Sequence, residues 1–146
     1  MSKMKVLFLC TANSARSQMA EALVNHDMGD RYVAFSAGTS PTAPRPEALK
    51  VLAEIGIDHS RARSKSIDEF ESQSFDYVIT LCGAANETCP LFFGGVERVH
   101  LGFEDPARVT GTEEEVLAAF RRVRDQIRES VENYLRSRTP GSLAEN

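Results

Sequence analysis

Apolar and polar positions follow two different periods along the chain. Short apolar runs bounded by turn residues, which are typical of buried parallel strands, occupy residues 5–9, 31–38, 75–82 and 96–103. Segments with apolar residues three or four positions apart, which are typical of amphipathic helices, occupy residues 17–27, 46–55 and 112–135. The pattern predicts strands that alternate with helices, as in an α/β fold.

Local signals mark the ends of several helices. Pro46 suits the first turn of a helix, and Gly56 ends that helix. Ser66–Glu69 and Thr112–Glu115 each place a glutamate three positions after a hydroxyl residue, which is the capping-box pattern. The first box predicts a short helix, and the second predicts the start of a long C-terminal helix.

The order of these elements predicts one four-stranded parallel sheet with helices on both faces, joined by right-handed crossovers. The compact doubly wound strand order is 2-1-3-4, which makes the first and third strands neighbours. Ligands bind such sheets at the carboxyl ends of these two strands, where Cys10 and Cys82 stand. We expect a single catalytic domain at residues 1–137 and a flexible tail at residues 138–146.

Composition and charge narrow the class of protein. The chain has 146 residues, 42% of them hydrophobic, and a net charge of −4, which suits one core and argues against a broad nucleic-acid surface. The first apolar run stops after about five residues, short of the ~7–15 of a secretory signal, and no run approaches the ~20 of a membrane span. We therefore expect a soluble cytoplasmic protein that binds neither nucleic acid nor membrane.

The chain has three cysteines, Cys10, Cys82 and Cys89, which cannot all pair with one another. In a reducing compartment such residues serve packing, catalysis or redox chemistry. A zinc site built from these cysteines and the three histidines is less favoured, because the sequence has no CxxC motif and no close Cys/His pair. We expect no bound metal of this kind.

The stretch CTANSARS, Cys10–Ser17, leads from the first strand through a tight loop into a helix. Such a loop aims backbone N–H groups at one point near the positive end of the helix dipole, which favours anion binding. The guanidinium of Arg16 can grip two oxygens of a tetrahedral oxyanion, and the same field favours the thiolate of Cys10 as a nucleophile. Ser17 can donate a hydrogen bond to that sulfur, and Asn13 can hold the shape of the loop. The residues expected to bind the oxyanion are Thr11, Ala12, Asn13, Ser14, Ala15, Arg16 and Ser17.

The longer stretch VLFLCTANSARSQMAE resembles the phosphate-binding loop of the low-molecular-weight protein tyrosine phosphatase superfamily. The resemblance implies that fold for nearly the whole chain. It also implies a general acid in an Asp-Pro pair, which Asp105 and Pro106 supply. This carboxyl group can protonate a leaving oxygen if its loop reaches the crevice.

Two functions share this loop, and the later cysteines distinguish them. Cys82 and Cys89 match the redox pair of the thioredoxin-coupled arsenate reductases, and the resemblance extends through VITLCG, GFEDPAR and GTEEE. Ala107 and Arg108 stand where the phosphatases carry aromatic walls for a substrate ring. The resemblance implies an arsenate reductase without a tightly bound cofactor, with phosphate and sulfate as competing oxyanions. The alternatives are a phosphatase that forms a phospho-enzyme on Cys10 and, third, a non-catalytic oxyanion binder.

The mechanism that the resemblance implies moves electrons through three thiols. Cys10 attacks arsenate held by the loop and Arg16, while Asp105 protonates the departing oxygen. Cys82 then attacks the sulfur of Cys10 and releases arsenite, and Cys89 resolves the disulfide. Thioredoxin reduces the final disulfide from outside, although the sequence leaves open a glutaredoxin-type donor. We expect a monomer.

Some reductases of this family bind potassium behind the loop. Asn13, Glu21 and Ser36 match that site, but Arg63 and Lys65 stand where those relatives carry oxygen ligands. The ammonium group of Lys65 can substitute for the ion. We therefore expect weak potassium dependence or none.

Overall fold

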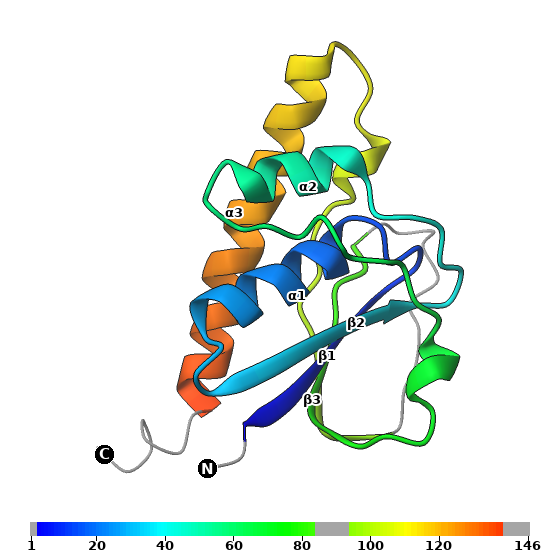
Figure 1. The fold of residues 1–146 in the computed structure, drawn as a ribbon, viewed down its shortest axis with the longest axis vertical. Coiled ribbons are helices and arrows are strands. Elements are labelled where there is room, and N and C mark those ends of the chain that lie inside the picture. Colours follow the sequence, from blue (N-terminus) through cyan, green and yellow to red (C-terminus); the bar gives the residue numbers. More distant parts are fainter. Residues whose placement is uncertain (1–2, 84–93, 139–146) are drawn as a thin grey trace.

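A computed structural model describes residues 3–83 and 94–138 of the protein. These residues form a four-stranded parallel sheet in the order β2-β1-β3-β4, which confirms the predicted topology (Figure 1). The strands are β1 (Met4–Cys10), β2 (Tyr32–Gly38), β3 (Phe75–Thr80) and β4 (Gly95–His100). The carboxyl ends of β1 and β3 therefore meet at one edge of the sheet.

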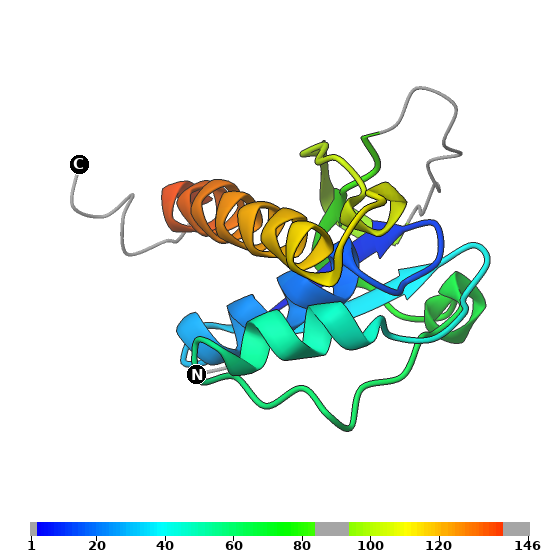
Figure 2. The same cartoon turned by 90° about the horizontal axis from the view of Figure 1, so that it is seen from above.

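Three α-helices cover one face of this sheet. They are α1 (Arg16–Asp27), α2 (Pro46–Ala53) and α3 (Glu113–Arg138). The helices contact one another and lie side by side in Figure 2. They enclose the main core with Val6 and Phe8 of β1 and Ile79 of β3, all of which are fully buried. Among the described residues, no helix combines the length and the apolar character that a membrane crossing needs.

The opposite face of the sheet has a smaller aromatic core. Leu7 and Leu9 of β1 pack there with Phe70 of the short 3-10 helix η1 (Ile67–Phe70). Phe35, Phe70 and Phe75 meet edge to face, with ring centroids 5.7–5.8 Å apart. Helices thus lie on both faces as predicted, but in the described part of the chain the α-helices all lie on one of them.

Both predicted capping boxes begin a helix. At the start of α3 the amide of Thr112 donates to Glu115 and the amide of Glu115 donates to the Thr112 hydroxyl, each at 3.1 Å. These bonds lower the pKa of Glu115. At Ser66 the hydroxyl accepts from the amide of Asp68 at 3.1 Å, and the helix that follows is the 3-10 helix η1. The long helix reaches Arg138, where the predicted tail begins, and residues 139–146 lie outside the described residues.

Two close backbone contacts fix the edge of the sheet where β1 and β3 end. The amide of Leu81 donates to the carbonyl oxygen of Leu9 at 2.9 Å, so the two chain segments stay paired beyond the end of β3. A Cβ atom at Gly38, the last residue of β2, would collide with the carbonyl oxygen of Thr11. Glycine at this position therefore lets the loop after β1 lie directly against β2.

Candidate active site

The two cysteines of the described residues lie where the paired segments β1 and β3 end. The last register pair is Leu9 with Thr80, and the amide of Leu81 donates to the carbonyl oxygen of Leu9, so Cys82 lies one residue beyond the level of Cys10. Both cysteines are buried and carry no disulfide. The fold therefore brings the two predicted thiols to the same edge of the sheet. The third, Cys89, lies outside the described residues.

The loop between β1 and α1 turns its carbonyl oxygens away from its centre. Those of Thr11, Ala12 and Ser14 accept hydrogen bonds from backbone amides of the segment after β2, at 2.9, 3.1 and 2.9 Å. The carbonyl oxygen of Asn13 accepts from Gln18 and Ser64. The peptide bonds of this loop are trans. In a trans peptide the N–H group points opposite to the C=O group that precedes it, so the N–H group after each of these outward carbonyl groups points inward. These N–H groups face the inside of the loop, which is the arrangement that holds an anion.

Asn13 fixes the shape of this loop. Its φ of 51° lies in the left-handed region, which asparagine tolerates better than most residues. Its side chain is fully buried, and its Oδ1 accepts from the backbone amide of Lys65 at 2.8 Å. Its Nδ2 donates to the hydroxyl oxygen of Ser17 at 2.7 Å, and that hydroxyl lies 2.8 Å from the sulfur of Cys10. Asn13 and Ser17 thus connect the loop backbone to the cysteine.

Arg16, the first residue of α1 after the loop, lies close to Asp105. The guanidinium of Arg16 is buried and donates to the carbonyl oxygens of Phe103 at 3.1 Å and Leu81 at 3.4 Å. Its Nη2 lies 3.7 Å from Oδ2 of Asp105. The other carboxylate oxygen of Asp105 accepts from the amide of Ala107 at 3.0 Å and caps the 3-10 helix η2 (Pro106–Arg108). This bond orients the carboxyl group, and its Oδ2 faces the arginine.

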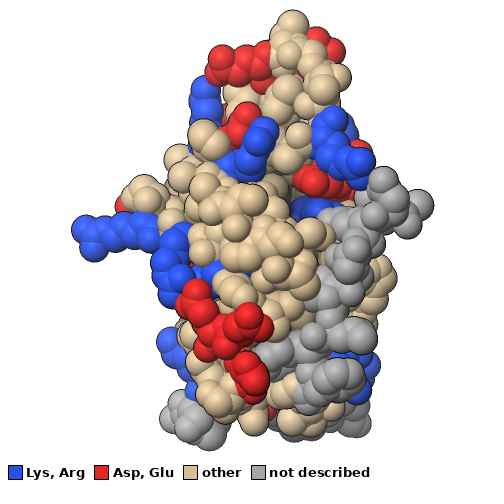
Figure 3. Space-filling view, turned by 90° about the vertical axis from the view of Figure 1, so that its right-hand side faces the viewer, with Lys and Arg blue, Asp and Glu red and all other residues tan. Residues whose placement is uncertain are grey.

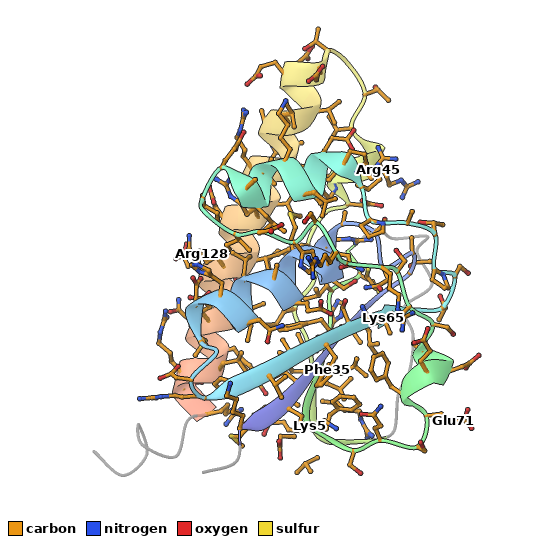
Figure 4. All side chains as sticks on the ribbon, in the orientation of Figure 1. Lys5, Phe35, Arg45, Lys65, Glu71 and Arg128 are labelled. Carbon is orange, nitrogen blue, oxygen red and sulfur yellow. The ribbon has the colours of Figure 1, made fainter. Side chains whose placement is uncertain are left out.

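A second group of polar residues lies behind the loop. Oε1 of Glu21 accepts from the hydroxyl of Ser36 at 2.8 Å, and Nζ of Lys65 lies 3.5 Å from the same oxygen. The Lys65 ammonium also donates to the carbonyl oxygen of Arg63 at 3.1 Å. Figure 4 shows Lys65 beside the end of β2. Both charged side chains are mostly buried, with 14% and 15% exposure. Within residues 3–83 and 94–138, no group of three or more His, Cys, Asp or Glu residues is arranged to hold a metal ion.

The structure adds two residues to which the sequence assigned no role at the loop. Gln18 is fully buried, and its Nε2 donates to the backbone oxygens of Asn13 and Arg63 at 3.0 and 2.9 Å. Nε2 of His59 lies 2.8 Å from Oε1 of Gln18. Burial lowers the pKa of His59. For Gln18 the sequence offered one signal, a polar side chain directly before the apolar residues Met19 and Ala20 of a predicted helix.

The surface at this end of the molecule carries charges of both signs. Figure 3 looks onto the face toward which β1 and β2 run, and Lys and Arg side chains are interspersed there with Asp and Glu. On the described part of this face the basic residues do not merge into one continuous patch. The described part of this face therefore provides no wide basic field that would attract anions.

A loop between the first strand and the first helix, a buried cysteine before it and an arginine and an Asp-Pro pair beside it, on a sheet in this strand order, are the features of an enzyme of the phosphatase fold. Residues 5–145 match the low molecular weight phosphotyrosine protein phosphatase family, and the chain belongs to that family.

Similar proteins within this family are named as reductases. The chain is 46% identical over 134 residues to a protein of Halalkalibacterium halodurans named arsenate reductase, covering 92% of this chain and 96% of that one. A solved structure described as an arsenate reductase in the phosphate binding state is 33% identical, with a TM-score of 0.78 and coverage of 92% and 98%. A thioredoxin-dependent arsenate reductase of Corynebacterium glutamicum is 29% identical, with a TM-score of 0.63 and coverage of 92% and 63%.

Proposed function

We propose that this protein is an arsenate reductase that uses Cys10 as its nucleophile and delivers its electrons through Cys82 and Cys89 to thioredoxin. The observation that carries the proposal is the contact of 2.8 Å between the buried Cys10 sulfur and the Ser17 hydroxyl, beneath inward-facing N–H groups. The similarity to proteins named arsenate reductase supports the substrate, and the Corynebacterium protein supports the reductant.

In the first step the Cys10 thiolate attacks the arsenic atom of arsenate. The loop N–H groups and Arg16 hold the oxyanion, because donors with fixed positions stabilise its charge without reorganising. An arsenic–oxygen bond breaks, and Asp105 gives its proton to the departing oxygen, which leaves as water. The oriented carboxyl group 3.7 Å from Arg16 supports this assignment.

In the second step the Cys82 thiolate attacks the sulfur of Cys10. The electron pair of the sulfur–arsenic bond passes to arsenic, which is reduced from As(V) to As(III) and leaves as arsenite. The two sulfurs are oxidised to a Cys10–Cys82 disulfide, which requires their segments to be neighbours. The hydrogen bond between Leu9 and Leu81 keeps them adjacent.

In the third step the Cys89 thiolate attacks Cys82 and releases Cys10 as a thiolate. Thioredoxin then reduces the Cys82–Cys89 disulfide by thiol–disulfide exchange, so the enzyme needs no tightly bound cofactor. We further propose that it works in the cytoplasm as a monomer, with residues 1–137 as one catalytic domain. A reducing compartment would keep its thiols available between turnovers.

A phosphatase activity is the second candidate, because Cys10, Arg16 and Asp105 are also the groups that phosphate-monoester hydrolysis needs. The residues after the Asp-Pro pair favour arsenate over an aryl phosphate. Ala107 has only a methyl group and Arg108 no aromatic ring, whereas a phenyl ring binds best against an aromatic wall.

One pair of assays separates these functions. Arsenite production is measured with thioredoxin, thioredoxin reductase and NADPH, and hydrolysis of p-nitrophenyl phosphate is measured beside it. We expect Cys10→Ser to abolish both activities, and Cys82→Ser or Cys89→Ser to abolish only arsenate reduction. Arsenite production that is unchanged in Cys82→Ser would rule out the relay, and phosphate hydrolysis without arsenite production would establish the phosphatase. Replacing thioredoxin with glutaredoxin and glutathione identifies the electron donor.

A further inference from the structure

A continuous chain of hydrogen bonds links His59 to the sulfur of Cys10. Nε2 of His59 lies 2.8 Å from Oε1 of Gln18, and Nε2 of Gln18 lies 3.0 Å from Oδ1 of Asn13. Nδ2 of Asn13 lies 2.7 Å from the hydroxyl oxygen of Ser17, which is 2.8 Å from the sulfur. The first residue of this chain has 12% of its side chain exposed, and the other four residues are buried.

The orientation of the Gln18 amide follows from its neighbours. One end of this amide faces the backbone oxygens of Asn13 and Arg63, and these oxygens can only accept hydrogen bonds. The NH2 group must therefore occupy that end, which leaves Oε1 facing His59. An amide oxygen can only accept, so Nε2 of His59 must carry a hydrogen and donate it. The neutral ring is thus fixed as the Nε2–H tautomer.

The same reasoning gives the direction of the remaining bonds. Oδ1 of Asn13 faces the backbone N–H of Lys65, which can only donate, so Nδ2 must face Ser17. The Ser17 oxygen accepts that hydrogen bond, and its own hydrogen is then available for the sulfur of Cys10. Each group in the chain therefore donates toward the thiolate, with one hydrogen of the Gln18 amide shared between the backbone oxygen and Oδ1 of Asn13. Aligned hydrogen bonds of this kind strengthen one another.

We propose that His59 is a positioning residue for Cys10, because its Nε2–H satisfies the buried Oε1 of Gln18 and, through Gln18 and Asn13, strengthens the hydrogen bond from the Ser17 hydroxyl to the sulfur. The inference deepens the proposed function, in which Cys10 is the nucleophile. Without the donor at His59, Oε1 of Gln18 would be a buried acceptor without its hydrogen bond. The Gln18 side chain would then lose the contact that holds its oxygen end, and its bonds to Asn13 and Arg63 would weaken.

The charged groups around His59 do not interrupt this chain. Oε2 of Glu21, on α1, lies 3.9 Å from Nε2 of the ring. The charges of Lys65 and Asp58, both in the segment after α2, also interact with the ring. Protonation of the imidazole adds a hydrogen at Nδ1 and leaves the Nε2–H in place. The donor toward Gln18 therefore persists in both charge states of His59.

The test measures the nucleophile directly and needs no arsenate. In a Cys82→Ser/Cys89→Ser background Cys10 is the single thiol, and its alkylation by iodoacetamide is followed against pH. We expect His59→Leu to move the midpoint of the profile upward by about half a pH unit, which is about a threefold slower reaction below the midpoint. We expect His59→Gln to restore the profile, because its amide nitrogen takes the place of Nε2 and can donate to Gln18. The side chain lines an open cavity of about 270 Å³ between α2 and the loop that follows, which gives both substitutions room.

His26→Leu is the matched control, because His26 is a half-exposed histidine of α1 that contacts Asp27 and not the loop. We expect its alkylation profile to equal that of the parent protein. Thermal denaturation of all three variants shows that each is folded. A parental profile in folded His59→Leu would overturn the proposal, and so would equal slowing in His59→Leu and His59→Gln.

Nitrogen-15 NMR provides a second and independent readout. We expect the neutral ring of His59 to be the Nε2–H tautomer, and an Nδ1–H tautomer would overturn the proposal. Neither measurement depends on substrate. Failure of arsenate reduction would therefore remove the proposed function while the alkylation profiles and the tautomer still decide the role of His59.

Discussion

The hydroxyl oxygen of Ser17, in the first turn of α1, lies 2.8 Å from the sulfur of Cys10 at the end of β1, and both side chains are buried. The hydroxyl accepts from Asn13, so its hydrogen points to the sulfur. A hydrogen bond to a charged partner is stronger than one between neutral groups, and burial increases the difference. This contact therefore stabilises the thiolate more than the thiol.

We expect Ser17→Ala to slow both arsenate reduction and alkylation of Cys10 at neutral pH. Loss of a hydrogen bond to a charged group costs about 1.5–3 kcal/mol, which corresponds to roughly 10- to 100-fold in rate. Ser137→Ala is the control, because it removes a serine hydrogen bond of 2.6 Å at the far end of α3. Equal alkylation rates in Ser17→Ala and the parent protein would contradict this role.

We expect Asp105→Asn to lower kcat by about 10²- to 10⁴-fold, the range found when a general acid is removed. The amide oxygen of asparagine can still accept from Ala107, so η2 and its loop should keep their structure. Phosphate binding, measured by calorimetry, should remain within a few-fold of the parent. Asp68→Asn on η1 replaces an aspartate outside this contact and serves as the control. A normal kcat in Asp105→Asn would mean that another group protonates the leaving oxygen.

The contact between Lys65 and Glu21 gives a prediction about potassium. The ammonium lies where an ion could contact Glu21, so we expect the melting temperature of the parent protein to be equal in potassium and sodium chloride. Lys65→Met leaves a mostly buried carboxylate without this partner and should destabilise the fold by about 1–3 kcal/mol. Lys50→Met removes an exposed ion pair with Glu113 and should cost less than about 1 kcal/mol. A higher melting temperature of the parent protein in potassium chloride than in sodium chloride would contradict the idea that the Lys65 ammonium takes the place of the ion.

A carboxyl pair between α1 and α3 makes stability depend on pH. Burial, with the hydrogen bond and the charge of Asp27, raises the pKa of Glu132 to about 8. Burial opposes ionisation of Asp27 as well, but hydrogen bonds from Glu132 and Arg128 lower its pKa well below the ordinary value. At neutral pH the folded protein therefore keeps a proton on Glu132, which donates to the Asp27 carboxylate.

We expect Glu132→Gln to stabilise the protein at alkaline pH. The folded-state pKa of Glu132 is above its ordinary value of 4.5, so its contribution is full below pH 4.5 and is lost as pH rises through about 8. Glutamine can donate to Asp27 at every pH, and the variant should melt about 2–4 °C higher than the parent at pH 9 but not at pH 5. Glu129→Gln, at an exposed position of the same helix, is the control. If the difference in melting temperature between Glu132→Gln and the parent were the same at pH 5 and pH 9, the raised pKa of Glu132 would be contradicted.

The sequence predicted the elements of the fold because their signals are local. Apolar periodicity over a few residues identified each strand and helix, and the box Thr112–Glu115 marked the start of α3 to within one residue. The third strand was predicted to reach Cys82 but ends at Thr80, because apolar residues continue where the pairing with β4 stops. The strand order also followed, since few compact arrangements satisfy right-handed crossovers.

By itself the sequence determined the strands and helices, the loop Cys10–Ser17 and the family to which the chain belongs, because each is recognised from residues close together in the chain. Only the tertiary structure decided that Arg16 meets Phe103 and Asp105, and that His59 holds Gln18 beneath the loop. These contacts join residues from 41 to 89 positions apart, and two buried polar groups are paired only when the packing of helices on the sheet brings them within bonding distance. No local pattern specifies that distance.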